Sequence, residues 1–219
     1  MPHRPKQNSL PPSRGDKSRA SILAAAGKIF ATSGLAGART DNIAAAAGVN
    51  KALLYYYFKS KQALYEAVVE DQFSQFNRQA LEILNSKGSP REVLLRYVNM
   101  HLDFISARHQ SAPIFQQLTM SNGNFLRRLI RKYFAARAEA LGRLIDRGIR
   151  SREFRRVDRF QTGVSIIALI IFYFSSAPIL KLLGHSNAYS PANLKRRKKE
   201  VLDFIRHGLF TNPKLPNHE

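Results

Sequence analysis

The sequence predicts an all-α protein. Apolar residues recur at spacings of three and four along most of the chain, as at Ile22, Ala26, Ile29 and Phe30, which is the period of an amphipathic helix. No stretch shows the sustained alternation of apolar and polar residues that is typical of a strand. A short helical pattern, a glycine and a second short helical pattern follow within about twenty residues, which is the spacing of a helix-turn-helix. We therefore expect about nine helices, in an N-terminal three-helix unit and a larger C-terminal helical domain.

The first two helices of the N-terminal unit have clear boundary signals. The first is expected from Ser18 to Gly34, since a glycine commonly follows the last helical turn. Thr40 is expected to be the N-cap of a short helix at residues 41–47, because a hydroxyl there accepts a hydrogen bond from a free backbone N–H. Gly48 then permits a left-handed turn that a side chain with a β-carbon would resist.

Two further helices follow the glycine turn. Asn50 is expected to cap a helix at residues 51–57, and Ser60 to cap a longer one at residues 61–84. A helix-turn-helix needs a small residue at the helix crossing, a glycine in the turn and an apolar residue that locks the second helix. Ala44, Gly48 and Leu54 supply these three features in that order.

The C-terminal part predicts five further helices with loops between them. They are expected at residues 91–106, from Ser111–Pro113 through Leu118, at 125–149, from Asp158 to about Ala177 where Pro178 halts the helix, and from Pro191 to about Gly208. The expected organisation is a flexible basic tail at residues 1–16, a helix-turn-helix domain at 17–63, a helical domain at 64–210 and a flexible C-terminal tail at 211–219. The first residues contain no apolar run of the kind found in a secretory signal.

The composition favours a polyanionic partner and argues against an enzyme. The chain of 219 residues has 35 Lys and Arg against 15 Asp and Glu, a formal net charge of +20. Such an excess favours nucleic acid first and an anionic membrane surface second. The chain has no cysteine, and it lacks the phosphate-binding, nucleophile-elbow and zinc-protease motifs. We therefore predict no catalytic residue, no metal site and no cofactor.

Residues 22–69 closely resemble the DNA-binding domain of the TetR family of transcriptional regulators. The resemblance rests on an AAxxxFxxxG pattern, a threonine before the second helix, an IAxxAGV turn and an LYxYFxSKxxL pattern, carried by Ala25, Ala26, Phe30, Gly34, Thr40, Ile43, Ala44, Ala47, Gly48, Val49, Leu54, Tyr55, Tyr57, Phe58, Ser60, Lys61 and Leu64. Two residues depart from the family pattern: Leu53 stands where a small polar residue is frequent, and Tyr56 where histidine is frequent. The operator sequence therefore cannot be taken from a relative.

The resemblance implies that residues 51–57 form a recognition helix that enters the major groove of DNA. Lys51, Ala52 and Leu53 are then the expected base contacts, with Lys51 reaching either a guanine edge or a phosphate. Phosphate contacts are expected from Arg39, Thr40, Tyr55, Tyr56 and Lys61. Residues 1–61 hold ten Lys and Arg against two acidic residues, which agrees with a DNA-facing domain, and the basic tail is a further candidate for DNA contact.

The resemblance also implies a homodimer formed through the last two helices, and a small-molecule effector bound among the central helices. Residues 160–180 contain no charged residue, so by length alone they are a membrane-span candidate; we predict a buried helix instead. An excess of basic residues at 127–159 suggests an anionic effector or a secondary contact with nucleic acid, although a solvated helix face explains it better. The effector is expected to be apolar or anionic. The expected pocket residues are Phe73, Phe76, Met100, His101, Phe104, Phe115, Tyr133 and Phe172.

The sequence thus predicts a cytoplasmic, ligand-released repressor that binds an inverted-repeat operator in double-stranded DNA as a homodimer. The alternative is a basic protein that binds nucleic acid or a membrane surface without a defined site. The two differ in their behaviour with competitor DNA, because only a specific regulator continues to prefer one palindrome.

Overall fold

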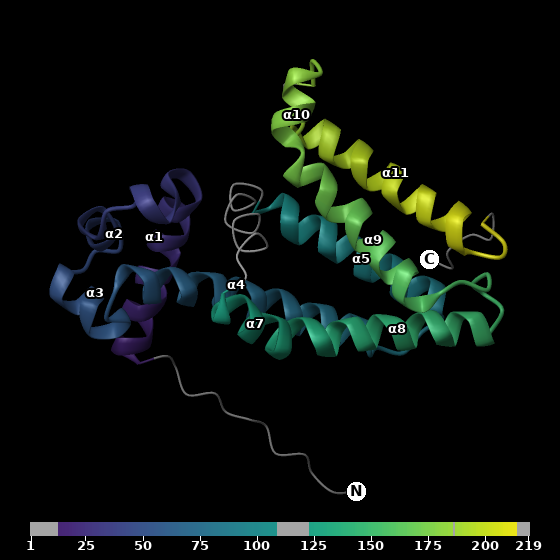
Figure 1. Ribbon diagram of the computed structural model, residues 1–219, viewed down its shortest axis with the longest axis horizontal. Helices are drawn as coiled ribbons and strands as arrows, with labels where there is room; N and C mark the ends of the chain where they lie inside the picture. The colour runs from purple at the N-terminus through teal and green to yellow at the C-terminus, as the bar shows by residue number, and fades with distance from the viewer. Residues whose placement is uncertain (1–12, 109–122, 186, 214–219) are drawn as a thin grey trace, which may run out of the picture. The chain divides into compact units, whose positions relative to one another are not determined.

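The computed structural model describes residues 13–108, 123–185 and 187–213, and these are helical almost throughout (Figure 1). The described residues contain no strand beyond one isolated bridge between Phe154 and Phe210. When α7, η2 and α8 are taken as one continuous helix, the described residues form nine helices. The predicted all-α class is therefore confirmed.

The chain divides into two compact units, Met1–Val68 and Val69–Glu219. The division falls inside one helix, α4 (Lys61–Leu84), a few residues after the predicted domain boundary at residue 63. The predicted start of that helix at residue 61 and its predicted end at residue 84 both agree with the structure.

The first unit opens with α1 (Arg14–Gly37), which begins earlier than the predicted start at Ser18. The reason is a capping box: the Asp16 backbone N–H donates to Ser13 Oγ at 3.1 Å, and the Ser13 N–H donates to Asp16 Oδ2 at 3.1 Å. Residues 14–16 therefore belong to the helix and not to a flexible tail, while residues 1–12 lie outside the described residues. Gly34 has a φ of +63° and interrupts α1 where the sequence predicted its end.

The helix-turn-helix consists of α2 (Thr40–Ala46) and α3 (Lys51–Phe58). Gly48 between them has a φ of +69°, which confirms the left-handed turn. Asn50 caps α3 as predicted, since its Oδ1 accepts from the Leu53 N–H at 2.8 Å. The prediction that Thr40 is the N-cap of α2 was wrong: Arg39 holds that position without a side-chain hydrogen bond, and Thr40 is the first helical residue and is buried.

The core of the first unit forms where these helices cross. Its fully buried side chains, all at most 1% exposed, are Ile22, Ala26, Phe30, Ile43, Leu54 and Leu64. Ala44 is 4% exposed, and the predicted locking residue Leu54 is 0% exposed. The motif spacing read from the sequence therefore corresponds to a packed interior.

The second unit consists of α5 (Pro90–Ser106), α7 (Asn124–Leu129), η2 (Ile130–Phe134), α8 (Ala135–Arg150), α9 (Arg159–Ser175), α10 (Ala177–Leu182), α11 (Pro191–Leu209) and the later part of α4. Helix α5 packs against α8, α9 and α11, and α8 packs against α9 (Figure 1). Side-chain caps at Ser89, Asp158 and Ser190 set the starts of α5, α9 and α11. Leu94, Val98, Leu141, Ile145, Ile170, Val201 and Ile205 are among the core residues.

Three details of the second unit differ from the sequence prediction. The long helix predicted at residues 125–149 contains a π-helical turn, η2, in which the Ala135 N–H donates to the Ile130 carbonyl. The helix predicted to stop near Pro178 ends at Ser175, and α10 follows it. Thr211, which was assigned to a flexible tail, is held by its N–H, which donates to the Glu153 carbonyl at 3.0 Å. The short helix expected before Leu118 lies outside the described residues.

Helix α1 is the only helix of the described residues that is long and apolar enough to cross a membrane by length and composition. Its apolar residues Ile22, Ala26 and Phe30 are instead buried in the first unit. Helix α9 has 17 residues, and Ile166, Ile170 and Phe174 pack into the core of the second unit. One side of that apolar segment is therefore buried as predicted, whereas Phe160, Val164 and Phe172 on α9 are exposed.

Candidate nucleic-acid interface and ligand cavity

Helix α3 buries one side and exposes the other. Leu54 and Phe58 are 0% and 4% exposed, and they fix the helix to the core. Lys51, Ala52, Tyr55 and Tyr56 are exposed, and Leu53 is half-buried. The residues that the sequence assigned to DNA contact on this helix therefore lie on its accessible side, with Leu53 the least accessible of them.

Lys51, at the start of α3, is held by a carboxylate from α2. Its Nζ lies 2.9 Å from Asp41 Oδ1 and donates to Oδ2 at 3.1 Å. This hydrogen bond raises the pKa of Lys51 above its ordinary value, so the ammonium stays charged. The sequence did not indicate this pair, because it depends on the angle between the two helices.

The two tyrosines assigned to phosphates differ in their surroundings. Tyr55 is 36% exposed, and its hydroxyl oxygen lies 3.3 Å from Thr40 Oγ1. Tyr56 is 69% exposed, and its ring has the Lys59 ammonium 5.6 Å from its centroid. Thr40 and Tyr55 therefore form one hydroxyl pair, whereas Tyr56 extends into solvent.

Lys61 has a structural role that the sequence did not indicate. Its ammonium donates to the carbonyl oxygens of Ala36 and Ala38, both at 3.2 Å. These carbonyls close the end of α1, where a cation is favourable. An ammonium carries three N–H groups, so one remains for the phosphate contact that the sequence assigned to it. Arg39 is exposed.

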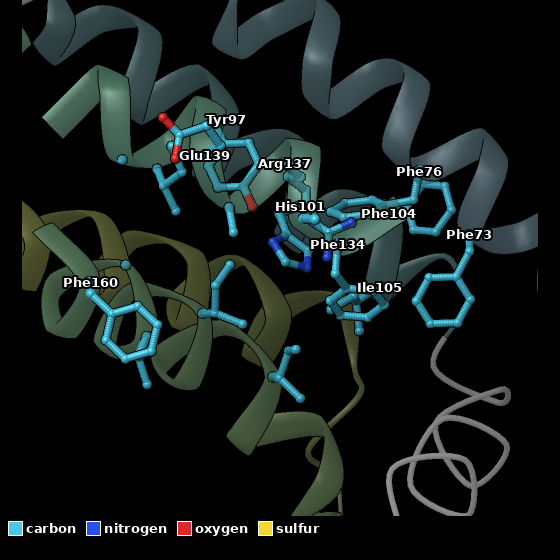
Figure 2. A pocket seen from close by; sticks show the side chains of 18 of the residues that line it. Phe73, Phe76, Tyr97, His101, Phe104, Ile105, Phe134, Arg137, Glu139 and Phe160 are labelled. Atoms are coloured by element: carbon cyan, nitrogen blue, oxygen red, sulfur yellow. The ribbon is translucent and has the colours of Figure 1, made fainter. Parts of the chain in front are cut away.

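A cavity of about 560 Å³ lies within the second unit, between α4, α5, the η2–α8 helix and α9. Of the predicted pocket residues, Phe73, Phe76, His101 and Phe104 line it (Figure 2). The Phe76 ring centroid lies 4.4 Å from that of His101, 5.1 Å from that of Phe104 and 4.8 Å from the Arg137 guanidinium carbon, and Figure 2 shows Phe160 apart from this group. The volume is in the range of small-molecule sites.

The other predicted pocket residues do not line this cavity. Met100 packs against the core cluster, and the Tyr133 hydroxyl donates to Glu70 Oε1 at 3.2 Å. Phe172 is 68% exposed, because it lies on the opposite side of α9 from the buried Ile166 and Ile170. Phe115 lies outside the described residues.

Sequence reasoning missed several lining residues, of which Tyr97 and Arg137 are the most informative. Arg137 is only 8% exposed, and its guanidinium carbon lies 4.8 Å from the Phe76 ring centroid and 4.6 Å from that of Phe134. Composition and charge do not distinguish one buried arginine among many basic residues. The signal available was the position of Arg137 within the apolar stripe of a long helix.

Burial controls the protonation of these groups. Desolvation lowers the pKa of His101 to about 3 and raises the pKa of Tyr97 to about 12, with the nearby Arg137 as a second influence on each. Desolvation also lowers the pKa of Arg137 from its ordinary value, although a guanidinium stays charged at neutral pH. The buried part of the cavity wall therefore carries a neutral imidazole, a neutral phenol and the Arg137 cation, while Arg108, Glu139 and Arg159 line its less buried part.

Two family descriptions match this chain, and together they cover most of both units. Residues 22–68 match the bacterial regulatory proteins of the tetR family, and residues 90–205 match the tetracyclin repressor-like C-terminal domain. The chain belongs to the TetR family. It is a DNA-binding transcriptional regulator, and the members of this family are not enzymes.

Curated relatives of this TetR regulator agree with the assignment. The transcriptional repressor NicS of Pseudomonas putida is 26% identical over 166 residues, which cover 74% of this chain and 78% of NicS. The fatty acid metabolism regulator of Bacillus subtilis is 27% identical over 135 residues, covering 61% and 69% of the two chains.

Solved structures share the fold of the TetR regulator. A candidate transcriptional regulator from Saccharomonospora viridis, in complex with choline, superposes with a TM-score of 0.73 at 20% identity, covering 90% of this chain and 99% of that one. FadR of Bacillus subtilis, in complex with stearoyl-CoA, superposes with a TM-score of 0.67 at 21% identity. The superposition covers 85% of this chain and 96% of FadR. At these identities the likeness establishes the fold alone.

Proposed function

We propose that this TetR regulator is a cytoplasmic homodimeric repressor that binds an inverted-repeat operator and is released from it by a small molecule. The proposal of DNA binding rests on the exposed side of α3. This side presents Lys51, Ala52, Tyr55 and Tyr56, while the other side of the helix is packed into the core. A helix presented in this way is suited to the major groove. Repression is favoured because NicS is a repressor.

The proposed DNA contacts are of two kinds: phosphate contacts position the protein on the duplex, and base contacts determine the sequence preference. Lys51 is directed by Asp41 and reads a guanine edge or contacts a phosphate, and Ala52 and Leu53 offer apolar surface to a thymine methyl group. Arg39, Thr40, Tyr55, Tyr56 and Lys61 hold phosphates. The N-terminal tail adds a sequence-independent contact.

The test is selection of bound sequences from random DNA, followed by binding measurements at two salt concentrations. An inverted repeat is expected, with half-sites about 34 Å apart. Lys51→Ala should either relax the preference at one base pair, by about 1–3 kcal/mol, or reduce the salt slope by about 0.9. Lys28→Ala is the matched control, since Lys28 is exposed on α1. Equal behaviour of the two variants would remove Lys51 from the interface, and equal affinity for any DNA would favour a non-specific basic binder.

The homodimer is supported by apolar side chains left exposed on the last helices. Phe172 on α9, Leu182 on α10 and Phe204 on α11 are 68%, 89% and 65% exposed. Large exposed apolar patches mark interaction surfaces, and a second copy of the chain is the partner expected for a TetR regulator. Phe204→Glu should shift the protein toward monomer in sedimentation velocity, whereas Tyr56→Glu, in the first unit, should not. A wild-type monomer at micromolar concentration would refute the dimer.

The effector proposal rests on the cavity of the second unit. The relatives with bound choline and stearoyl-CoA support the idea that a helical domain of this kind takes a small molecule. Phe73 and Phe76 of α4 line the cavity, and α4 begins at Lys61 in the DNA-binding unit, so a ligand that moves α4 reaches both. Fluorescence anisotropy on the selected operator, with fractionated metabolite pools, should identify a fraction that releases the protein. Release that persists when the cavity is filled by Ala138→Trp would contradict this site.

A further inference from the structure

Three buried polar groups on the cavity wall lack hydrogen-bond partners among the described residues. They are the Tyr97 hydroxyl, His101 Nδ1 and Arg137 Nη1, on side chains that are 0%, 4% and 8% exposed. An unsatisfied buried polar group costs about 1–3 kcal/mol, and more if it is charged. All three side chains line the cavity, and Figure 2 shows them on neighbouring positions of its wall. A ligand that satisfies them together is the simplest reason for their presence.

Three arginines line the cavity, and Arg137 is the buried one that forms no ion pair with a described carboxylate. Arg108 donates to Gln75 Oε1 at 3.2 Å, and Arg159 Nη1 lies 2.8 Å from Asp146 Oδ2. No described carboxylate forms an ion pair with Arg137, and residues 109–122, which the structure does not describe, contain no acidic residue. Aromatic rings on two sides stabilise the cation without neutralising it.

The acidic lining residue does not serve as that partner. The Glu139 side chain is 54% exposed, and its Oε1 lies 3.7 Å from Arg143 Nη1 on the next turn of α8. A buried cation without a counter-charge is unfavourable, so an anion that enters the cavity gains the full interaction. A ligand cation would instead be repelled.

We propose that the cavity takes an amphiphilic monocarboxylate, with its carboxylate on Arg137 and Tyr97 and its apolar body among the phenylalanines. The guanidinium offers a fork of N–H donors that fits two carboxylate oxygens. The Tyr97 hydroxyl is a neutral donor beside it. The body lies against Phe73, Phe76, Phe104, Phe134 and Phe160. His101 is neutral, so Arg137 is the buried positive charge of the wall, and the less buried Arg108 adds to the preference for an anion.

This inference rests on the proposed function only in taking the cavity for the effector site. Its test therefore uses the full-length protein without DNA. Calorimetry compares decanoate, decan-1-ol and decyltrimethylammonium below their micelle concentrations, and repeats the comparison with 4-phenylbutyrate and 4-phenylbutan-1-ol. In at least one series the carboxylate should bind tenfold or more tightly than the matched alcohol, and the ammonium should bind weakest.

Variants then locate the head group. Arg137→Met should abolish the carboxylate preference, and Tyr97→Phe, which removes one oxygen atom, should reduce it severalfold. Arg131→Met is the matched control, because Arg131 is exposed on the same continuous helix and its loss changes the net charge equally. If Arg137→Met fails to fold, the carboxylate preference is measured in Tyr97→Phe and Arg137→Lys instead. Equal binding of alcohol and carboxylate, binding of neither series, or a preference that survives in the Tyr97 and Arg137 variants would overturn the proposal.

A separate arm distinguishes this inference from the release mechanism. The carboxylate that binds is added to the protein–operator complex. Binding without release would leave the head-group assignment standing and refute ligand release by this class. Release by alcohol and carboxylate alike would support ligand release and refute the role of Arg137.

Discussion

Gly148 on α8 faces the ring of Phe154, and Gly148→Ala should destabilise the second unit. A Cβ atom at this position would lie 2.6 Å from Phe154 Cγ and still closer to two other ring carbons. The ring cannot easily move away, because Phe154 is 2% exposed, stacks on Phe210 at 5.4 Å, and donates its N–H to the Gly148 carbonyl at 3.0 Å. The glycine is therefore required by the close approach of the ring.

The magnitude follows from two opposed contributions. Overpacking of a filled core costs about 1–3 kcal/mol, and contacts this short place the cost at the upper end. Alanine regains up to about 1 kcal/mol of helix propensity over glycine. The expected net loss is about 2 kcal/mol, or a fall in melting temperature of about 4–8 °C for a chain of this size.

Gly142→Ala on the same helix is the control for this prediction. A Cβ atom at Gly142 meets nothing closer than Arg159 Cδ at 3.7 Å, an ordinary contact, so alanine should raise the melting temperature slightly. Both variants are measured by thermal unfolding at one protein concentration, because any self-association would make the melting temperature depend on concentration. A Gly148→Ala protein as stable as Gly142→Ala would refute the packing argument.

Three further predictions concern the turn, the cavity and the end of α1. Gly48→Ala should cost about 1–2 kcal/mol, because its φ of +69° disfavours a β-carbon although the space around it is open. Gly208→Ala, in equally open space near the end of α11, should be neutral to slightly stabilising in the same unfolding assay. Because burial lowers the pKa of His101 from 6.5 to about 3, only the unfolded chain binds this proton between those pH values, so stability should fall by about 1.4 kcal/mol per unit as the pH drops below 6.5. His101→Phe should flatten that pH profile, and equal slopes would contradict a neutral buried imidazole. Lys61→Met should lower stability by about 1–3 kcal/mol, since two charge-assisted hydrogen bonds to the end of α1 are lost, and an unchanged denaturation midpoint would show that they contribute little.

The helix-turn-helix could be predicted from the sequence because its determinants are local. Gly48, Asn50 and Leu54 act on residues only a few positions away, through a backbone dihedral angle, a cap and a contact at fixed helical spacing. Thr40 was misplaced because its hydroxyl has a competing partner in Tyr55, which lies 15 residues later. The error arose where a tertiary contact replaced a local one.

The cavity could be predicted only in part, because its wall is made by side chains from four helices. Phe73, Phe76, His101 and Phe104 were found since they lie on amphipathic stripes whose apolar side faces inward. Phe172 lies in a segment that is apolar all round, where periodicity cannot separate the core side from the exposed side. Arg137 was missed because composition treats all basic residues alike, whereas the fold places this one between two rings.

The π-helical turn at residues 130–134 has a consequence for the cavity. Successive residues of an α-helix are offset by about 100°, so one additional residue rotates everything that follows relative to everything that precedes it. Phe134 and Arg137 come at the end of this insertion and just after it. Deleting one residue within the turn would restore regular α-helical winding and rotate the Arg137 guanidinium away from the cavity. The caps of α5 and α9 would be unaffected. The turn therefore sets which side chains of α8 face the cavity without any change in the helices around it.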